Sequence, residues 1–181
     1  MAESLVTECV SDMKTLASNY TRGFTLIEMI VVTAIVSLFA AGIVAVINPT
    51  QQVLKANDAR RKSDLNSLQR GLEAYYHDFG SYPPASNYRI APQGTALAWG
   101  VAWSPYMNTL PKDPNGSRTY IYYVSPDGQS YLVYASLEKA TTDPQSCNAG
   151  AACTSLSSRS IATNACGGTC NYAVASPDID P

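Results

Sequence analysis

An apolar segment near the N-terminus constrains this chain more than any other feature. Phe24 to Ile47 is a run of 24 residues in which Glu28 is the only charged residue. A helix of this length would measure about 36 Å, which is enough to span a bilayer with some tilt. A carboxylate inside such a span costs free energy and is usually functional. We therefore expect a membrane-spanning helix with a functional acid near its start.

Two other interpretations of the apolar segment are weaker. An ordinary secretory signal peptide is shorter, and it is followed directly by an A-x-A-like cleavage site that this chain lacks. A plain signal anchor explains the length of the segment. It gives no reason, however, for the small residue Gly23 at the border of the segment or for the acid Glu28.

The cysteines indicate an oxidising compartment. Of five cysteines, Cys9 precedes the apolar segment, and the other four lie in the last 35 residues: Cys147, Cys153, Cys166 and Cys170. Removal of residues 1–23 would leave an even number, which suits two disulfides. Four cysteines allow three connectivities, which the sequence does not separate, and we favour Cys147–Cys153 with Cys166–Cys170 because these pairs close the shortest loops. The alternative is zinc, but the spacings C-x5-C and C-x3-C depart from the usual zinc pairs and no histidine lies nearby.

The cysteines place the C-terminal side of the apolar segment outside the cytoplasm, whereas the positive charges around the segment indicate the reverse orientation. More cations follow the segment than precede it, so positive-inside counting would place the C-terminal side in the cytoplasm. We give more weight to the cysteines, because the later cations belong to a predicted helix that also carries Asp58 and Asp64. We therefore expect a single-pass precursor in the cytoplasmic membrane, with its C-terminal domain outside.

A helical pattern resumes after Asn48-Pro49, where the proline marks a bend or a restart. Apolar residues then recur at steps of three and four and form one stripe. The stripe consists of Leu65, Leu68, Leu72, Tyr75, Tyr76 and Phe79. Gly80 ends the pattern, and Tyr82-Pro83-Pro84 prevents its continuation. We predict one long helix from about Phe24 to Phe79.

Two segments rich in aromatic and β-branched residues, 119–124 and 130–135, flank the turn sequence Ser125-Pro126-Asp127-Gly128. This order predicts an antiparallel hairpin, and its apolar side should cover the stripe. In the loop-rich segment 81–118, Trp99 and Trp103 are expected to cap the core. The tail from Thr141 has few large apolar groups, so it should need its cysteines to hold a shape.

Several motifs resemble those of one protein family. Gly23-Phe24-Thr25-Leu26-Ile27-Glu28 resembles the prepilin peptidase recognition site of type IV prepilins and pseudopilins. The stretch from Asn48-Pro49 to Leu65 is similar to the rear helix of pilin-like proteins. Tyr75-Tyr76, Gly80-Ser81-Tyr82-Pro83 and Leu110-Pro111-Lys112-Asp113-Pro114 resemble the major-pseudopilin branch of type II secretion systems. Together these motifs cover residues 22–138, and the tail from Cys147 matches no pattern.

The resemblance implies a maturation and an assembly. In that family the peptidase cuts after the glycine, here Gly23, and methylates the new N-terminus, here Phe24. Glu28 of one subunit would then face the Phe24 amine of a neighbour, because a buried charge costs far less when it is paired. The partners implied are copies of the chain, prepilin peptidase and an inner-membrane assembly platform. The end product would be an extracellular or periplasmic filament.

We therefore predict an α+β, type IV pilin-like fold: a long N-terminal helix with a small antiparallel sheet packed on its C-terminal half. Four segments are expected. They are a leader that is removed (1–23), a transmembrane and filament-core helix (24–47), its amphipathic continuation (48–80), and a globular region with a cysteine-containing tail (81–181).

The chain departs from the family pattern in three ways. Its leader is acidic, and a start at Met13 instead of Met1 would leave a more usual leader of 11 residues. The proline that often bends the pilin span is absent, with Gly42 and Pro49 in its place. The acidic calcium loop of major pseudopilins is not recognisable. Asp178 and Asp180 could supply calcium ligands, but exposed carboxylates in a tail are more often only solvated. We therefore expect no cofactor.

Other functions have less support from the sequence. No catalytic set is visible, and His77, the only histidine, is expected on the surface at a helix end. The formal net charge of -2 and the lack of interleaved aromatics argue against nucleic-acid binding by Arg60-Arg61-Lys62, which we assign to a solvated helix face with Asp58 and Asp64 as partners. The rival functions are a membrane-anchored binding domain that never polymerises, and a minor adhesive or DNA-uptake subunit.

Overall fold

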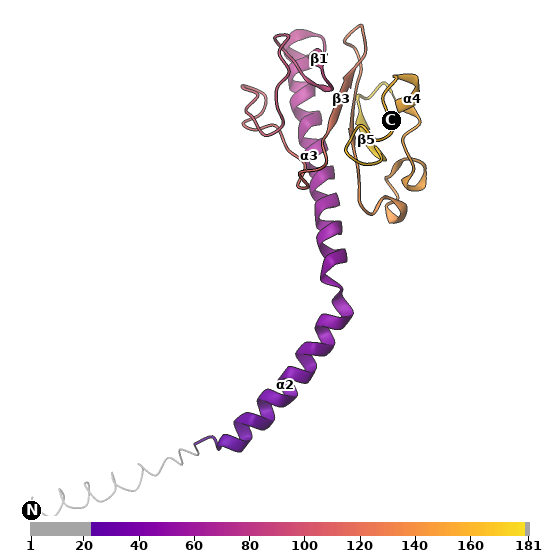
Figure 1. The fold of residues 1–181 in the computed structure, drawn as a ribbon. Helices are drawn as coiled ribbons and strands as arrows, with labels where there is room; N and C mark the ends of the chain where they lie inside the picture. The colour runs from indigo at the N-terminus through magenta and orange to yellow at the C-terminus, as the bar shows by residue number, and fades with distance from the viewer. Residues whose placement is uncertain (1–22, 180–181) are drawn as a thin grey trace, which may run out of the picture. The chain divides into compact units, whose positions relative to one another are not determined.

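The computed structural model describes residues 23–179, without the side chains of residues 44–47 (Figure 1). The described residues belong to two units that divide between Asn48 and Pro49, and each is described by itself. Residues 180–181 and the predicted leader up to residue 22 lie outside the described residues. The expectations for Cys9, for the start at Met13 and for Asp180 therefore concern residues that the structure does not describe.

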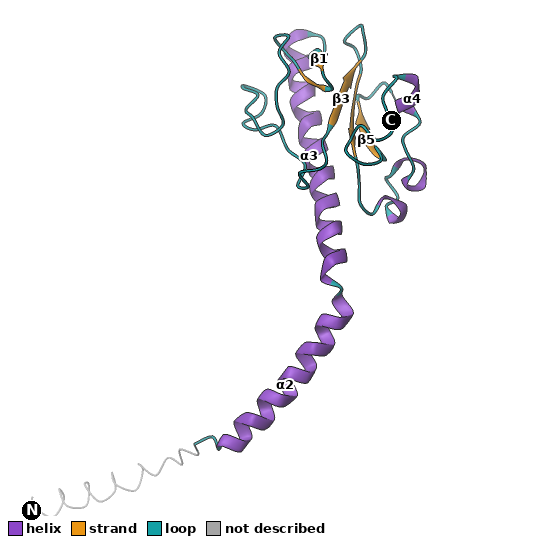
Figure 2. Ribbon diagram, viewed as in Figure 1, coloured by secondary structure: helices purple, strands orange, loops and turns teal. Residues whose placement is uncertain are grey.

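The predicted long helix is interrupted. Helix α2 spans Leu26–Ile47 and helix α3 spans Pro49–Phe79, with a break at Asn48 (Figure 2). Asn48 has φ 45° and ψ 79°, in the left-handed region that asparagine tolerates better than most residues. Pro49 suits the first position of the next helix, because its missing N–H group has no helical partner there. The expectation of one continuous helix is thus wrong, and Pro49 marks a restart.

The second unit contains two small antiparallel sheets. Strands β1 (Ala85–Ser86) and β2 (Arg89–Ile90) form one, and β3 (Ile121–Val124), β4 (Tyr131–Ala135) and β5 (Tyr172–Ala175) form the other in the order β3-β4-β5. The short helices η1 (Ala140–Thr142), η2 (Cys147–Gly150) and α4 (Ser155–Ser158) connect β4 to β5. The predicted hairpin is confirmed, as is the α+β fold, whereas β5 comes from the tail and was not predicted.

One face of the three-stranded sheet packs on α3. The stripe residues Leu65, Leu68 and Leu72 are fully buried, and Tyr75 is 9% exposed. They form one core with inward residues of the hairpin region: Tyr120, Tyr122, Tyr131 and Val133. Trp103 is buried in this core and Trp99 packs against it, as expected. The stripe ends sooner than predicted, since Phe79 is 61% exposed.

The other face of the sheet packs on the tail (Figure 1). A second cluster joins Leu132 and Tyr134 of β4 to Leu156 and Ile161, around two disulfides. These disulfides link Cys147 to Cys153 and Cys166 to Cys170, the pairing that closes the shortest loops. Every residue of β4 is buried, because the strand is central and covered on both faces.

Arg61 does not lie on a solvated helix face, and that expectation is wrong. Its side chain is fully buried, and its guanidinium donates from Nε and Nη2 to the two carboxylate oxygens of Asp113, at 2.8 and 3.0 Å. Nη1 donates to Oδ1 of Asp58 at 2.8 Å and lies 3.6 Å from Oε2 of Glu138. Burial alone would lower the pKa of Arg61, but the hydrogen bonds that Arg61 donates to Asp113 and Asp58 raise this pKa above its ordinary value.

The same cluster fastens two loops to α3. Asp58 accepts hydrogen bonds from the backbone N–H groups of Glu138 and Lys139, at 2.8 and 2.7 Å. Asp113 also accepts from the N–H of Asn115 at 2.8 Å. Asp64, the other expected partner of the cations, instead accepts from the hydroxyl of Tyr120 at 2.7 Å. Burial raises the pKa of Asp64 above its ordinary value, although this hydrogen bond opposes the rise.

Candidate processing and assembly site

The predicted cleavage site lies in non-helical chain before α2. Residues 23–25 have no regular structure, and Gly23 and Phe24 are both exposed. A Cβ atom added to Gly23 would meet nothing within 4 Å. The space beside Gly23 is thus open among the described residues, and glycine lets another backbone approach closely.

Thr25 positions the start of the helix. Its Oγ1 accepts a hydrogen bond from the N–H of Glu28 at 3.3 Å, and its carbonyl accepts from the N–H of Met29 at 3.2 Å. The helix therefore begins at Leu26. The spacing Thr25-x-x-Glu28 is that of a capping box, so the start of this helix has a signal in the sequence itself.

Glu28 lies in the first turn of α2 and is exposed within this unit. The N-terminal end of a helix carries a partial positive charge, so a carboxylate is favoured at this position. Glu28 is therefore only about one helical turn beyond Phe24 in the chain, and Phe24 would carry the new amine after cleavage.

The rest of α2 presents apolar side chains on all sides. Among the residues that the structure describes, this is the one helix long and apolar enough to cross a membrane, and none of its window Leu26–Ile43 is buried. The hydroxyls of Thr33 and Ser37 donate to the carbonyls of Met29 and Thr33, at 2.9 and 2.6 Å. Polar groups satisfied within the helix suit both lipid and a bundle of like helices.

Other residues singled out in the sequence belong to the second unit. The four cysteines hold the tail, and the side chain of His77 is 90% exposed. Asp178 is exposed in the segment after β5. Within residues 23–179 no group of three or more His, Cys, Asp or Glu side chains could hold a metal ion.

Two family models match the chain. Residues 18–44 match the prokaryotic N-terminal methylation motif, and residues 48–145 match type II secretion system protein G. The chain belongs to the type II secretion system protein G family. It is similar to the type II secretion system core protein G of Escherichia coli (strain K12), with 30% identity over 105 residues, which are 56% of this chain and 71% of that relative. No solved structure matches the chain.

Family membership makes this protein a structural filament subunit of the pseudopilin type. It favours the secretion branch over other pilin-like proteins, and it does not favour a membrane-anchored domain that never polymerises. The methylation motif includes Gly23, Phe24 and Glu28, while the protein G match ends at residue 145, before the cysteines. The disulfide-bonded tail is therefore an addition to the matched region.

Proposed function

We propose that this chain is made as a membrane precursor, is cut after Gly23 by prepilin peptidase, is methylated on Phe24, and then polymerises through α2 into a type II secretion pseudopilus. The single observation that carries this proposal is the exposed, contact-free Gly23 directly ahead of a Thr25-capped apolar helix with Glu28 in its first turn. A protease at a membrane face needs such an accessible backbone.

Cleavage would supply a partner for Glu28, which forms no ion pair among the described residues. Hydrolysis of the Gly23–Phe24 bond leaves a carboxylate on Gly23 and an ammonium group on Phe24, which stays positively charged after methylation. When apolar helices pack side by side, water is excluded from Glu28, and an unpaired charge there is costly. Pairing of Glu28 with the Phe24 ammonium of a neighbour removes much of that cost and fixes the register between subunits.

The proposed parts follow from this chemistry. Residues 1–23 form the leader, 24–47 the membrane and filament-core helix, 48–80 the amphipathic helix, and 81–181 the globular region outside the cytoplasmic membrane. The disulfides Cys147–Cys153 and Cys166–Cys170 suit that oxidising location. An assembly platform in the inner membrane would move subunits from lipid into the filament, where helix contacts replace lipid contacts.

Replacing Gly23 with valine should block maturation, because a branched side chain hinders the approach of the peptidase backbone. Gly42→Val is the matched control, since a Cβ at Gly42 also meets nothing within 4 Å but the residue lies inside α2. Intact-mass spectrometry of protein from cells should give a methylated chain beginning at Phe24 for wild type and for the control, and a full precursor for Gly23→Val.

The precursor mass also identifies the start of translation, either Met1 or Met13. Normal processing of the Gly23→Val chain would contradict the proposed cleavage site. A working filament whose subunits still carry the leader would contradict the proposed function as a whole.

A further inference from the structure

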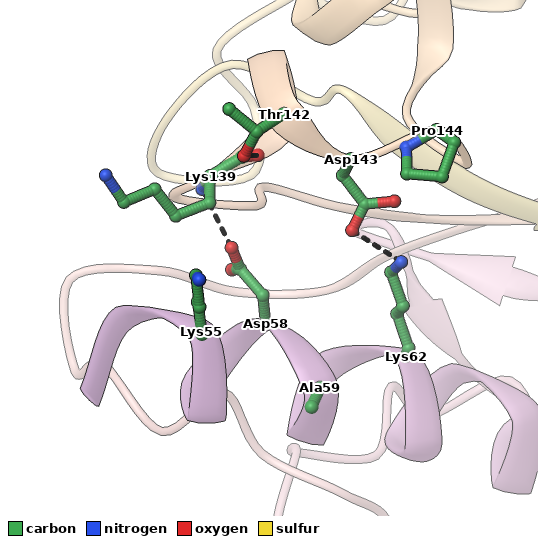
Figure 3. A pocket seen from close by; sticks show the side chains of 8 residues that line it. All are labelled: Lys55, Asp58, Ala59, Lys62, Lys139, Thr142, Asp143 and Pro144. Carbon is green, nitrogen blue, oxygen red and sulfur yellow. Dashed lines mark hydrogen bonds and ion pairs between the residues drawn. The ribbon is translucent and has the colours of Figure 1, made fainter. Parts of the chain in front are cut away.

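A pocket of about 300 Å³ lies between the start of α3 and the segment around η1 (Figure 3). Lys62 Nζ pairs with Asp143 at 2.5 Å and donates to Gln145 at 2.9 Å. Burial alone would raise the pKa of Asp143, but the bond from Lys62 lowers it below its ordinary value. Lys55 and Lys139 line the same pocket, and neither has an ion-pair partner among the described residues.

These cations gather at one end of the second unit. Figure 3 shows the side chains of Lys55 and Lys139 at the same end of the pocket, away from the Lys62–Asp143 pair. Arg60 is also exposed on this part of α3. We call Lys55, Arg60 and Lys139 the basic end, and we leave out Lys62 because Asp143 neutralises its charge. Arg61 adds nothing to it, because the buried carboxylates described above neutralise its charge.

Four carboxylates without a Lys or Arg partner among the described residues lie near the opposite end of α3. We call Glu73, Asp78, Asp127 and Asp178 the acidic end. Asp78 is in the last turn of α3, and Glu73 lies one turn earlier. Asp127 is in the β3–β4 turn, which Gln129 joins to the end of α3 by donating to the carbonyl of Gly80 at 3.1 Å.

Asp178 reaches the same end through the sheet. The N–H of Ser176, directly after β5, donates to the carbonyl of Tyr131, the first residue of β4. The hydroxyl of Tyr131 in turn lies 3.3 Å from a carboxylate oxygen of Glu73. The end of β5, the start of β4 and the end of α3 are therefore neighbours, and the residues from Lys55 to Asp78 place the two charged ends about 35 Å apart along the helix.

This charge order does not stabilise α3 itself. A helix is stabilised by acids near its N-terminus and by bases near its C-terminus. Helix α3 has no acid in its first turn, and His77 is the one basic residue of a last turn that also contains Asp78. The two acids in its first half, Asp58 and Asp64, accept hydrogen bonds from Arg61 and Tyr120, whereas Lys55 and Arg60 are exposed. The exposed charges therefore gain nothing from the helix dipole, and their arrangement calls for a reason outside the single chain.

We infer, on the basis of the filament proposed above, that the basic end of one subunit docks on the acidic end of a second copy of this chain. The two surfaces are complementary in charge and lie at opposite ends of the same unit. A contact between two different surfaces of identical subunits generates an open filament wherever its rotation does not close a ring. An anionic lipid surface is a less suitable partner, because the chain carries a formal net charge of -2 and an acidic end.

Charge reversal in the full-length chain tests this contact. Lys55→Glu with Lys139→Glu, and separately Asp78→Lys with Asp178→Lys, should each reduce the filament sheared from cells about tenfold or more, because like charges then face each other. Combining all four substitutions should restore filament yield. The restored yield also shows that the altered chains fold.

The matched control is Arg70→Glu with Arg89→Glu, which changes the net charge as much as the basic-end variant. Both residues are exposed, and neither belongs to the basic end. We expect the control to assemble as wild type does, and every variant to be cut after Gly23, as intact mass would show.

Three results would overturn the head-to-tail contact. Equal loss in the control would mean that net charge alone matters. Loss in the basic-end variant without rescue by the combined variant would point to another partner, such as lipid headgroups. Normal assembly of all variants would show that the basic end and the acidic end do not contribute to contacts between subunits. Absence of filaments from wild type would instead refute the proposed function, so the two failures are distinguishable.

Discussion

Replacing Arg61 with alanine should unfold the second unit more readily than any other change of a single charged residue in α3. The substitution leaves Asp58 and Asp113 buried without their cation, and it also removes the guanidinium 3.6 Å from Oε2 of Glu138, an atom that is buried and has no hydrogen-bond partner. Breaking a buried ion pair on one side costs about 3–5 kcal/mol. Denaturant unfolding of the full chain in detergent, followed by tryptophan fluorescence, measures this loss.

Arg60→Ala is the matched control for this prediction. Arg60 is the neighbour of Arg61 on the same helix, but it is exposed, and exposed charges contribute little. Its removal should leave the unfolding midpoint nearly unchanged. Equal midpoints for the two variants would mean that the carboxylates around Arg61 find other partners, such as water, and that the cluster does not hold the loops to α3.

The position of Arg61 shows what sequence patterns omit. The three- and four-residue periodicity placed it on the polar face of the helix, and in the structure it is buried. Its burial depends on Asp113, which follows 52 residues later, and on the backbone around Glu138. No local sequence pattern includes partners so far away in the chain. The charge of Arg61 was therefore the only guide, and it predicted exposure to solvent.

Strand β5 was missed for a related reason. Tyr172–Ala175 is a short segment in a tail with few large apolar residues, and it becomes a strand by pairing with β4. The hairpin of β3 and β4, in contrast, was predictable, because both strands and their turn are adjacent in the chain. The break at Asn48 had a partial signal in Pro49, but the positive φ of Asn48 that ends α2 had none.

The N-terminal motif could be recognised from the sequence because its residues lie within six consecutive positions, and the match to the methylation motif covers them. The roles of Gly23, Phe24 and Glu28 in cleavage and assembly stay predictions, and the structure adds that Thr25 caps the helix between them. What remained outside the reach of the sequence is the arrangement of charges at the two ends of α3. That arrangement needs the turn between β3 and β4 and the segment after β5 to be placed in space.

Glu28→Val should leave cleavage intact and abolish filaments. The proposed cleavage site is the Gly23–Phe24 bond, where a Cβ on Gly23 would meet nothing within 4 Å, so intact mass should still show a methylated chain beginning at Phe24. In the filament core, however, the Phe24 ammonium would be buried without a counter-charge. A cost of several kcal/mol per subunit corresponds to a loss of about a hundredfold or more in assembly.

Two further variants separate the charge of Glu28 from its other roles. Glu28→Gln keeps the shape of the side chain and removes the charge, so it should also lose filaments. Thr25→Ala keeps the charge and removes the hydrogen bond to the Glu28 N–H, which weakens the helix start by about 1 kcal/mol and should leave most of the filament yield. Normal filaments from Glu28→Gln would show that the acid acts through packing, and pairing with the neighbouring amine would then be wrong. Thr25→Ala and Glu28→Val both disturb the first turn of the helix, but only Glu28→Val removes the carboxylate. If Thr25→Ala lost filaments as completely as Glu28→Val, the geometry of the first turn, and not the charge of Glu28, would be decisive for assembly.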